Sequence, residues 1–187
     1  SPRYTGPVEI GKSARFRATA LREGGENASY SREFAFSKST GRPAVLNTKP
    51  NDSYTFEGAS LLVDGYHSRP VFTSGAWLGY LDEPLDVTID MGGEQSYRSV
   101  ELETLAEKGD WIFPPSSVTV WVSDNGTDFT EVASVAVPEA KAGDADGIGR
   151  YRMQFPETSA RYLKVVAQNA AAIPAWHPGA GSKGFLF

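Results

Sequence analysis

Residues 118–126, Val-Thr-Val-Trp-Val-Ser-Asp-Asn-Gly, decide the fold class of this 187-residue chain. Valine occupies every second position and alternates with Thr119 and Trp121. A period of two is typical of a β-strand with one buried face. The Asp-Asn-Gly that follows is a hairpin turn signal. The stretch therefore predicts a strand that turns back into an antiparallel neighbour.

The same alternation recurs on both sides of this stretch, in residues 85–91, 151–155 and 161–166. Turn signals rich in glycine or aspartate separate these segments, among them Gly92-Gly93 and residues 144–147. Short strands separated by turns are typical of a β-sandwich or jelly roll, and no convincing long helix appears. We therefore predict an all-β fold.

The N-terminal segment forms a unit of its own. Residues 13–20 and 30–36 alternate like strands, and residues 23–27 are a turn signal. Two or three strands are too few to bury a core alone. We predict a partial small β-sandwich-type domain with its linker over residues 1–40 and a β-sandwich over residues 41–187. Because the chain ends on a strand-like Phe-Leu-Phe, we also interpret it as a piece of a longer protein.

Composition excludes several classes of partner and chemistry. The net charge is −5, and the 18 basic residues are dispersed, so we expect no nucleic-acid partner. No apolar stretch of transmembrane length occurs, so we expect no membrane insertion. We also expect the protein to be a monomer. Without cysteine, disulfides and cysteine-bound zinc are excluded. Two histidines and no nucleophile elbow or P-loop argue against an enzyme.

Three aromatic loops are the candidate binding segments: residues 66–77, 108–114 and 169–181. Sugar rings stack their apolar faces on indole rings, while their hydroxyl groups form hydrogen bonds with polar side chains. The predicted sugar contacts are Trp111, Trp176, His177, His67 and Arg69. The alternative for each aromatic residue is a structural role as a core or loop-filling side chain.

Acidic turns raise the question of calcium, which prefers oxygen ligands. Asp64 before Gly65 is one candidate ligand, and residues 144–147 are another candidate loop. The second loop lacks the rest of an EF-hand, including its terminal glutamate, so we predict an ordinary turn there. Asp64 is therefore the predicted metal ligand.

Five motifs follow one another along the chain in an order that resembles the discoidin, or coagulation factor type C, family over residues 43–187. They are Leu-Leu-Val-Asp-Gly at 61–65, Trp77, the strand at 85–92, the strand and turn at 115–126, and Ala-Arg-Tyr-Leu-Lys-Val at 160–165. The resemblance implies an eight-stranded jelly roll that binds terminal sugars of glycans on loops at one end. It also implies a structural Ca²⁺ ion, with Asp64 at the position of the family's aspartate ligand.

Residues 1–8 and 16–20 resemble a second family, the small β domain that follows the catalytic barrel of bacterial β-hexosaminidases. The combination is similar to the C-terminal tail of a family 20 glycoside hydrolase, a β-N-acetylhexosaminidase. It implies a non-catalytic carbohydrate-binding region of a secreted, extracytoplasmic bacterial enzyme, with the parent's catalytic domain as a further partner. The alternative is a domain that buttresses the barrel and has no ligand of its own.

Overall fold

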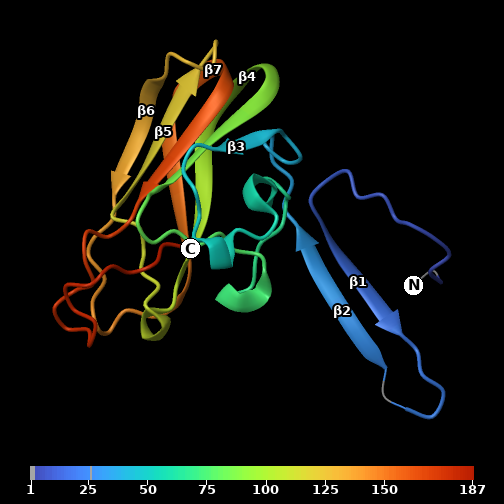
Figure 1. Ribbon diagram of the computed structural model, residues 1–187. Coiled ribbons are helices and arrows are strands. Elements are labelled where there is room, and N and C mark those ends of the chain that lie inside the picture. Colours follow the sequence, from blue (N-terminus) through green and yellow to red (C-terminus); the bar gives the residue numbers. More distant parts are fainter. Residues whose placement is uncertain (1–2, 26) are drawn as a thin grey trace.

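The computed structural model describes residues 3–25 and 27–187, and its regular secondary structure consists of strands and short 3₁₀ turns connected by long loops (Figure 1). One sheet pairs β1 with β2, and the other has the order β3-β4-β7-β5-β6. The strands are β1 Ala14–Ala20, β2 Ala28–Phe34, β3 Ala44–Leu46, β4 Leu85–Ala106, β5 Ser117–Ser123, β6 Thr130–Ala136 and β7 Gly147–Gln168. The short 3₁₀ turns are η1 Asp52–Tyr54, η2 Gly58–Leu62, η3 Phe72–Ser74 and η4 Lys108–Asp110. The predicted all-β fold is confirmed.

Three residues that the sequence patterns used, Ser1, Pro2 and Glu26, lie outside the described residues. The first two belong to the hexosaminidase-like motif and the third to the predicted turn at residues 23–27. Among the residues that are described, no helix has the length and apolar character needed to cross a bilayer.

The two long strands β4 and β7 organise the larger sheet. They pair antiparallel from Leu85↔Ala167 at one end to Ala106↔Gly147 at the other. Side chains from the first and second halves of β4, such as Val87 and Leu102, belong to one hydrophobic core. Each long strand therefore contributes to both layers of the sandwich, whereas the family resemblance implies eight separate strands.

The bend in β4 lies at Gly92, where the sequence predicts a turn between strands. The ladder with β7 is interrupted between Asp90 and Gln95, so the predicted turn is a bulge inside one strand. Gly92 has φ +79°, a conformation that favours glycine, and its N–H donates to Asp90 Oδ1 over 2.8 Å. Arg161 on β7 donates to both oxygens of the same carboxylate, from Nε over 2.9 Å and from Nη2 over 2.8 Å, and so connects the bend to β7.

The core confirms the alternation on which the fold class rests. Val118 and Val120 of β5 are fully buried, and Val122 is 7% exposed. They face the buried side chains of β4 and β7, including Ile89 and Leu163. Strand β5 pairs antiparallel with β6, which confirms the hairpin predicted from residues 118–126.

A second apolar cluster closes one end of the sandwich around the C-terminal residues. Phe187 packs with Trp77, Leu105 and Ile112, and the rings of Tyr54 and Phe187 lie 4.8 Å apart. The backbone joins in as well: residues 185–187 exchange hydrogen bonds with Tyr80, Leu105, Trp111 and Phe113 at 2.7 to 2.8 Å. The last residues of the chain are therefore internal to the fold.

The β1–β2 hairpin stands apart from the sandwich (Figure 1). Nearly all of its residues are exposed on both faces. It joins the sandwich at its base, where the Phe34 and Tyr66 rings lie 4.8 Å apart and Ala35 N–H donates to the Gly65 carbonyl over 2.7 Å. The predicted domain boundary between residues 40 and 41 stays a prediction.

Tyr80 provides a pH-dependent contribution to stability. Its side chain is 2% exposed, and burial raises the pKa of the hydroxyl to about 12. Below pH ~10, the tyrosine pKa in an unfolded chain, the folded and the unfolded protein both keep the hydroxyl proton, and the free energy of unfolding has its full value. Between about 10 and 12 only the unfolded chain loses it, so the free energy of unfolding falls by about 1.4 kcal/mol per pH unit.

Tyr80→Phe is expected to remove this alkaline loss, which amounts to about 3 kcal/mol at pH 12. Urea denaturation of wild type and variant at several pH values from 8 to about 12 measures the difference. Tyr30→Phe, at a position 52% exposed, is the control. Parallel curves for wild type and Tyr80→Phe would contradict the prediction.

Candidate functional site

Three of the five predicted sugar contacts meet at one end of the sandwich. Trp111 follows η4, while Trp176 and His177 lie in the loop after β7. The His177 ring stands edge-on to both indoles, with centroids 5.8 Å from Trp111 and 5.6 Å from Trp176. We call the two indoles of Trp111 and Trp176 the tryptophan platform.

Trp111 is held in an unusual backbone conformation. Its φ is +65°, in the left-handed region that large side chains rarely adopt. Gly179 packs directly on the indole, because a Cβ at this glycine would lie 2.7 Å from the ring. The rest of the indole faces solvent, and Trp111 is 42% exposed. Strained residues that the surroundings hold in place cluster at functional sites.

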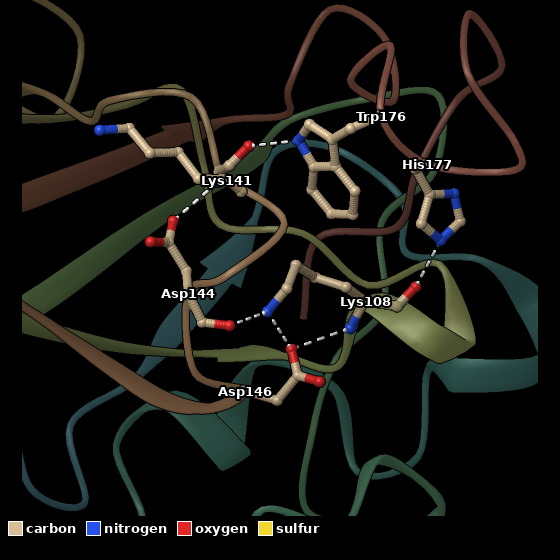
Figure 2. Close-up of polar contacts among 7 residues, drawn as sticks. Lys108, Lys141, Asp144, Asp146, Trp176 and His177 are labelled. Carbon is tan, nitrogen blue, oxygen red and sulfur yellow. Dashed lines mark hydrogen bonds and ion pairs between the residues drawn. The ribbon is translucent and has the colours of Figure 1, made fainter.

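Trp176 is fixed by its polar edge. Its Nε1–H donates to the Ala140 carbonyl over 2.9 Å, in the loop between β6 and β7 (Figure 2). The ring centroid lies 6.3 Å from that of Phe113. The residue is still 40% exposed, so an apolar part of the indole faces solvent while the nitrogen is occupied.

His177 is buried, at 9% exposure, and both of its ring nitrogens are used inside the protein. Nε2 donates to the Lys108 carbonyl over 2.9 Å, and Gly179 N–H donates to Nδ1 over 3.0 Å. These contacts place the ring proton on Nε2. The ring therefore connects two loops beneath the platform, and its nitrogens have no free position for a sugar hydroxyl.

Lys108 begins the candidate segment 108–114, but the sequence does not single it out as a site residue. Its side chain is buried, with Nζ paired to Asp146 and donating to the Asp144 carbonyl over 2.9 Å (Figure 2). The hydrogen bond from Lys108 lowers the pKa of the Asp146 carboxyl. The turn of this loop therefore spans residues 141–144, just before the predicted position, and Asp144 and Asp146 bind a lysine of the protein itself. No local signal could show this, because the partners are far apart in sequence.

His67 and Arg69 belong to a separate group. His67 Nδ1 lies 2.7 Å from Glu103 Oε1, which also accepts from Arg150 Nε over 2.6 Å. The Arg69 carbonyl accepts from the buried Trp77 indole over 2.8 Å. Within the described part of the chain, no hydrogen bond, ion pair or aromatic contact joins His67 or Arg69 to the platform. A cleft of about 340 Å³ lies between His67, Glu103 and Trp77.

Asp64 takes part in a local turn. Its Oδ1 accepts from Tyr66 N–H over 2.8 Å, and burial raises the pKa of its carboxyl. The described residues contain no group of three His, Cys, Asp or Glu side chains that could hold a metal ion. Calcium prefers six to eight oxygen ligands. The described side chains around Asp64 do not supply such a set of carboxylates. Calcium binding through Asp64 stays a prediction.

Solved structures similar to this chain include modules from Paenibacillus and Clostridium. Chitosan-binding module 1 of a chitosanase/glucanase from Paenibacillus sp. IK-5 is 18% identical, with a TM-score of 0.49, over 81% of this chain and 94% of that one. The module CpGH89CBM32-5 from Clostridium perfringens, in complex with GalNAc-β-1,3-galactose, is 16% identical, with a TM-score of 0.47, over 76% and 93%. A comparison with curated proteins gives no match.

A family model described as F5/8 type C domain matches residues 46–182. The match covers most of the chain and includes all the strands of the larger sheet from β4 to β7. It confirms the resemblance of residues 43–187 to the coagulation factor type C family. This chain therefore belongs to the F5/8 type C domain family.

Proposed function

We propose that this chain is a non-catalytic carbohydrate-binding module that holds terminal sugars of glycans on the tryptophan platform. The observation that carries the proposal is a pair of indoles, each about two-fifths exposed, on loops fixed by internal hydrogen bonds. An exposed aromatic face that is already immobile binds a sugar ring without a further loss of conformational entropy. Solvent-exposed loops on a rigid strand scaffold are where binding residues concentrate.

The residues take different roles in this proposal. Trp111 and Trp176 stack on the apolar faces of the sugar, and His177 holds the two loops together below them. The exposed side chain of Asp110 lies on the Trp111 loop, and that of Lys141 lies on the β6–β7 loop that binds Trp176; both are available for sugar hydroxyls. His67 and Arg69 form a second group, outside the platform, that would contact an extended glycan.

The proposed site is shallow, because each indole is partly covered by its own loops. A shallow site buries little area, so we expect dissociation constants from about tens of micromolar to about millimolar.

For the parent protein we propose a secreted, extracytoplasmic bacterial β-N-acetylhexosaminidase. The support is the resemblance of residues 1–8 and 16–20 to the β domain that follows the barrel in those enzymes. In this proposal the module keeps the catalytic domain close to its glycan.

A second candidate function is structural, with the chain acting as a buttress for the catalytic domain. The β1–β2 hairpin favours it, because it exposes apolar side chains such as Leu21 and Tyr30, at 81% and 52%. Large exposed apolar residues grouped on one element are typical of surfaces that contact another domain.

A glycan array with the purified chain, with and without calcium, tests the binding function. We expect hits on glycans that end in N-acetylhexosamine or galactose. Trp111→Ala and Trp176→Ala are each expected to weaken binding by about tenfold or more, since the side chain removed supplies the stacking surface. Phe56→Ala, at another aromatic residue that is 46% exposed, is the matched control and should bind like wild type.

Two results would count against the proposal. A blank array with a well-folded protein shifts the interpretation to the structural buttress. Binding that survives both tryptophan substitutions, with the fold intact, rejects the platform as the site. A response only in the presence of calcium would support the predicted role of Asp64, which Asp64→Ala then checks.

A further inference from the structure

Lys108 is a buried cation in a surface-loop region, an uncommon position for lysine. The residue is 7% exposed, although it lies only three positions before the half-exposed Trp111. Its Nζ pairs with the Asp146 carboxylate and donates to the Asp144 carbonyl over 2.9 Å. Its backbone N–H donates to the same Asp146 oxygen over 3.1 Å. Side chain and backbone together anchor the loop between β6 and β7.

One route leads from this anchor to Trp176. Asp144, whose carbonyl binds the ammonium, closes a turn through the Lys141 N–H, which donates to Asp144 Oδ2 over 2.7 Å. The residue before that turn, Ala140, supplies the carbonyl that accepts from the Trp176 indole over 2.9 Å. The position of Trp176 therefore depends on a loop that Lys108 holds (Figure 2).

A second route leads from the Lys108 carbonyl to both tryptophans. This oxygen accepts from Trp111 N–H over 3.0 Å and from His177 Nε2 over 2.9 Å. His177 in turn accepts from Gly179 N–H, and Gly179 packs against the Trp111 indole. The contacts form a closed ring through three loops, with Lys108 in each route.

The exposure of Asp146 decides what the loss of the cation would do. Its side chain is 48% exposed, so without Lys108 its carboxylate can be hydrated by a small movement of the loop. An unpaired charge that stays buried is strongly destabilising, whereas one that reaches water is not. Removal of the ammonium should therefore release residues 140–147 and leave the sandwich folded.

We propose that Lys108 is the positioning residue of the tryptophan platform: its buried ammonium and its carbonyl join three loops and so set the relative position of the Trp111 and Trp176 indoles. We call this connection between the three loops the Lys108 clamp. The expected effect on sugar affinity rests on the proposed binding function, whereas the existence of the clamp does not. Lys108 itself makes no contact with the ligand.

The indole N–H of Trp176 reports on the clamp without any sugar. In Lys108→Met, which keeps an apolar stem and removes the charge, we expect hydrogen exchange of this N–H, followed by NMR, to accelerate about tenfold or more. The indole N–H of Trp77, bonded to the Arg69 carbonyl over 2.8 Å, is an internal control and should not change. Asp146→Asn is the second variant and should act in the same direction.

Lys183→Met is the matched control, because Lys183 is an exposed lysine that also pairs with an aspartate, Asp82. It should leave exchange and affinity as in wild type. Lys108→Met is expected to weaken glycan binding about tenfold, equivalent to about 1.4 kcal/mol. A merely structural lysine would lower the melting temperature without changing Trp176 in the native state.

Unchanged exchange at Trp176 in both Lys108→Met and Asp146→Asn overturns the proposal, whatever happens to affinity. Accelerated exchange at Trp77 and Trp176 alike also overturns it, because the effect is then global. If the tryptophan substitutions leave glycan binding intact, the platform is not the sugar site. The exchange at Trp176 still decides the clamp in that case.

Discussion

Removal of residues 185–187 is expected to lower the free energy of unfolding by about 5–9 kcal/mol, the sum of about 1.5–3 kcal/mol for each of the buried Leu186 and Phe187 and the partly buried Phe185. Leu186 is 2% exposed and belongs to the main core, while Phe187 is 6% exposed and belongs to the aromatic cluster, against which Phe185 packs. The truncation also leaves the backbone groups of Tyr80 and Leu105 without their partners. Because domains are stable by only about 5–15 kcal/mol, a large fraction of the truncated chain should be unfolded.

Thermal and urea denaturation followed by circular dichroism measure this effect. At about 2–4 °C per kcal/mol for a chain of this size, the melting temperature should fall by at least about 10 °C. Phe187→Ala alone should cost about 3–5 kcal/mol, while Phe36→Ala, at a residue 37% exposed, should cost much less. A truncated protein that melts within a few degrees of wild type would show that residues 185–187 contribute little to the stability of the fold.

Val120→Asp is expected to prevent folding of the sandwich. Val120 has 0% exposure and lies on β5, paired with Ala133 on β6 and with Val165 on β7. A carboxylate at this position has neither water nor a cation as a partner. Substitutions that bury an unpaired charge cost about 4–5 kcal/mol or more, close to the whole stability of a domain.

The matched control is Val45→Asp on the edge strand β3, where the valine is 63% exposed. The same chemical change there should alter stability by less than about 0.5 kcal/mol. Near-UV circular dichroism and proton NMR dispersion distinguish the two outcomes. Native-like spectra for Val120→Asp, with a melting temperature near that of wild type, would mean that β5 is not central to the core.

The strands were predictable where one face of the sheet is buried. At residues 118–122 the buried valines alternate with polar or half-buried residues, and this periodicity is visible without any knowledge of the partner strands. Gly92-Gly93 was misread as a turn between strands, because a left-handed glycine serves a turn and a bulge equally well. Only the pairing of β4 with β7 on both sides of the glycine distinguishes them, and this pairing is a long-range property.

The candidate site was predictable in its aromatic residues but not in its connections. Trp111 and Trp176 stand in glycine- and proline-flanked loops, a pattern that indicates exposed aromatic side chains. The ion pair between Lys108 and Asp146 joins two loops that the pairing of Ala106 with Gly147, at the end of the β4–β7 ladder, brings together. The same limit applies to His67, which the sequence groups with the other aromatic loops and the structure pairs with Glu103.

The position of Phe185 and Phe187 in the aromatic cluster also constrains the order in which the protein forms during synthesis. Strands β3 to β7 leave the ribosome first and can pair at once, but Trp77, Leu105 and Ile112 lack their cover until Phe187 has been added. Contacts between residues distant in sequence form slowly and leave apolar surface exposed in the meantime. The loop end that carries Trp111 can therefore close only after residues 185–187 have been synthesised, and a nascent chain interrupted before residue 185 would hold a sandwich that is open at that end.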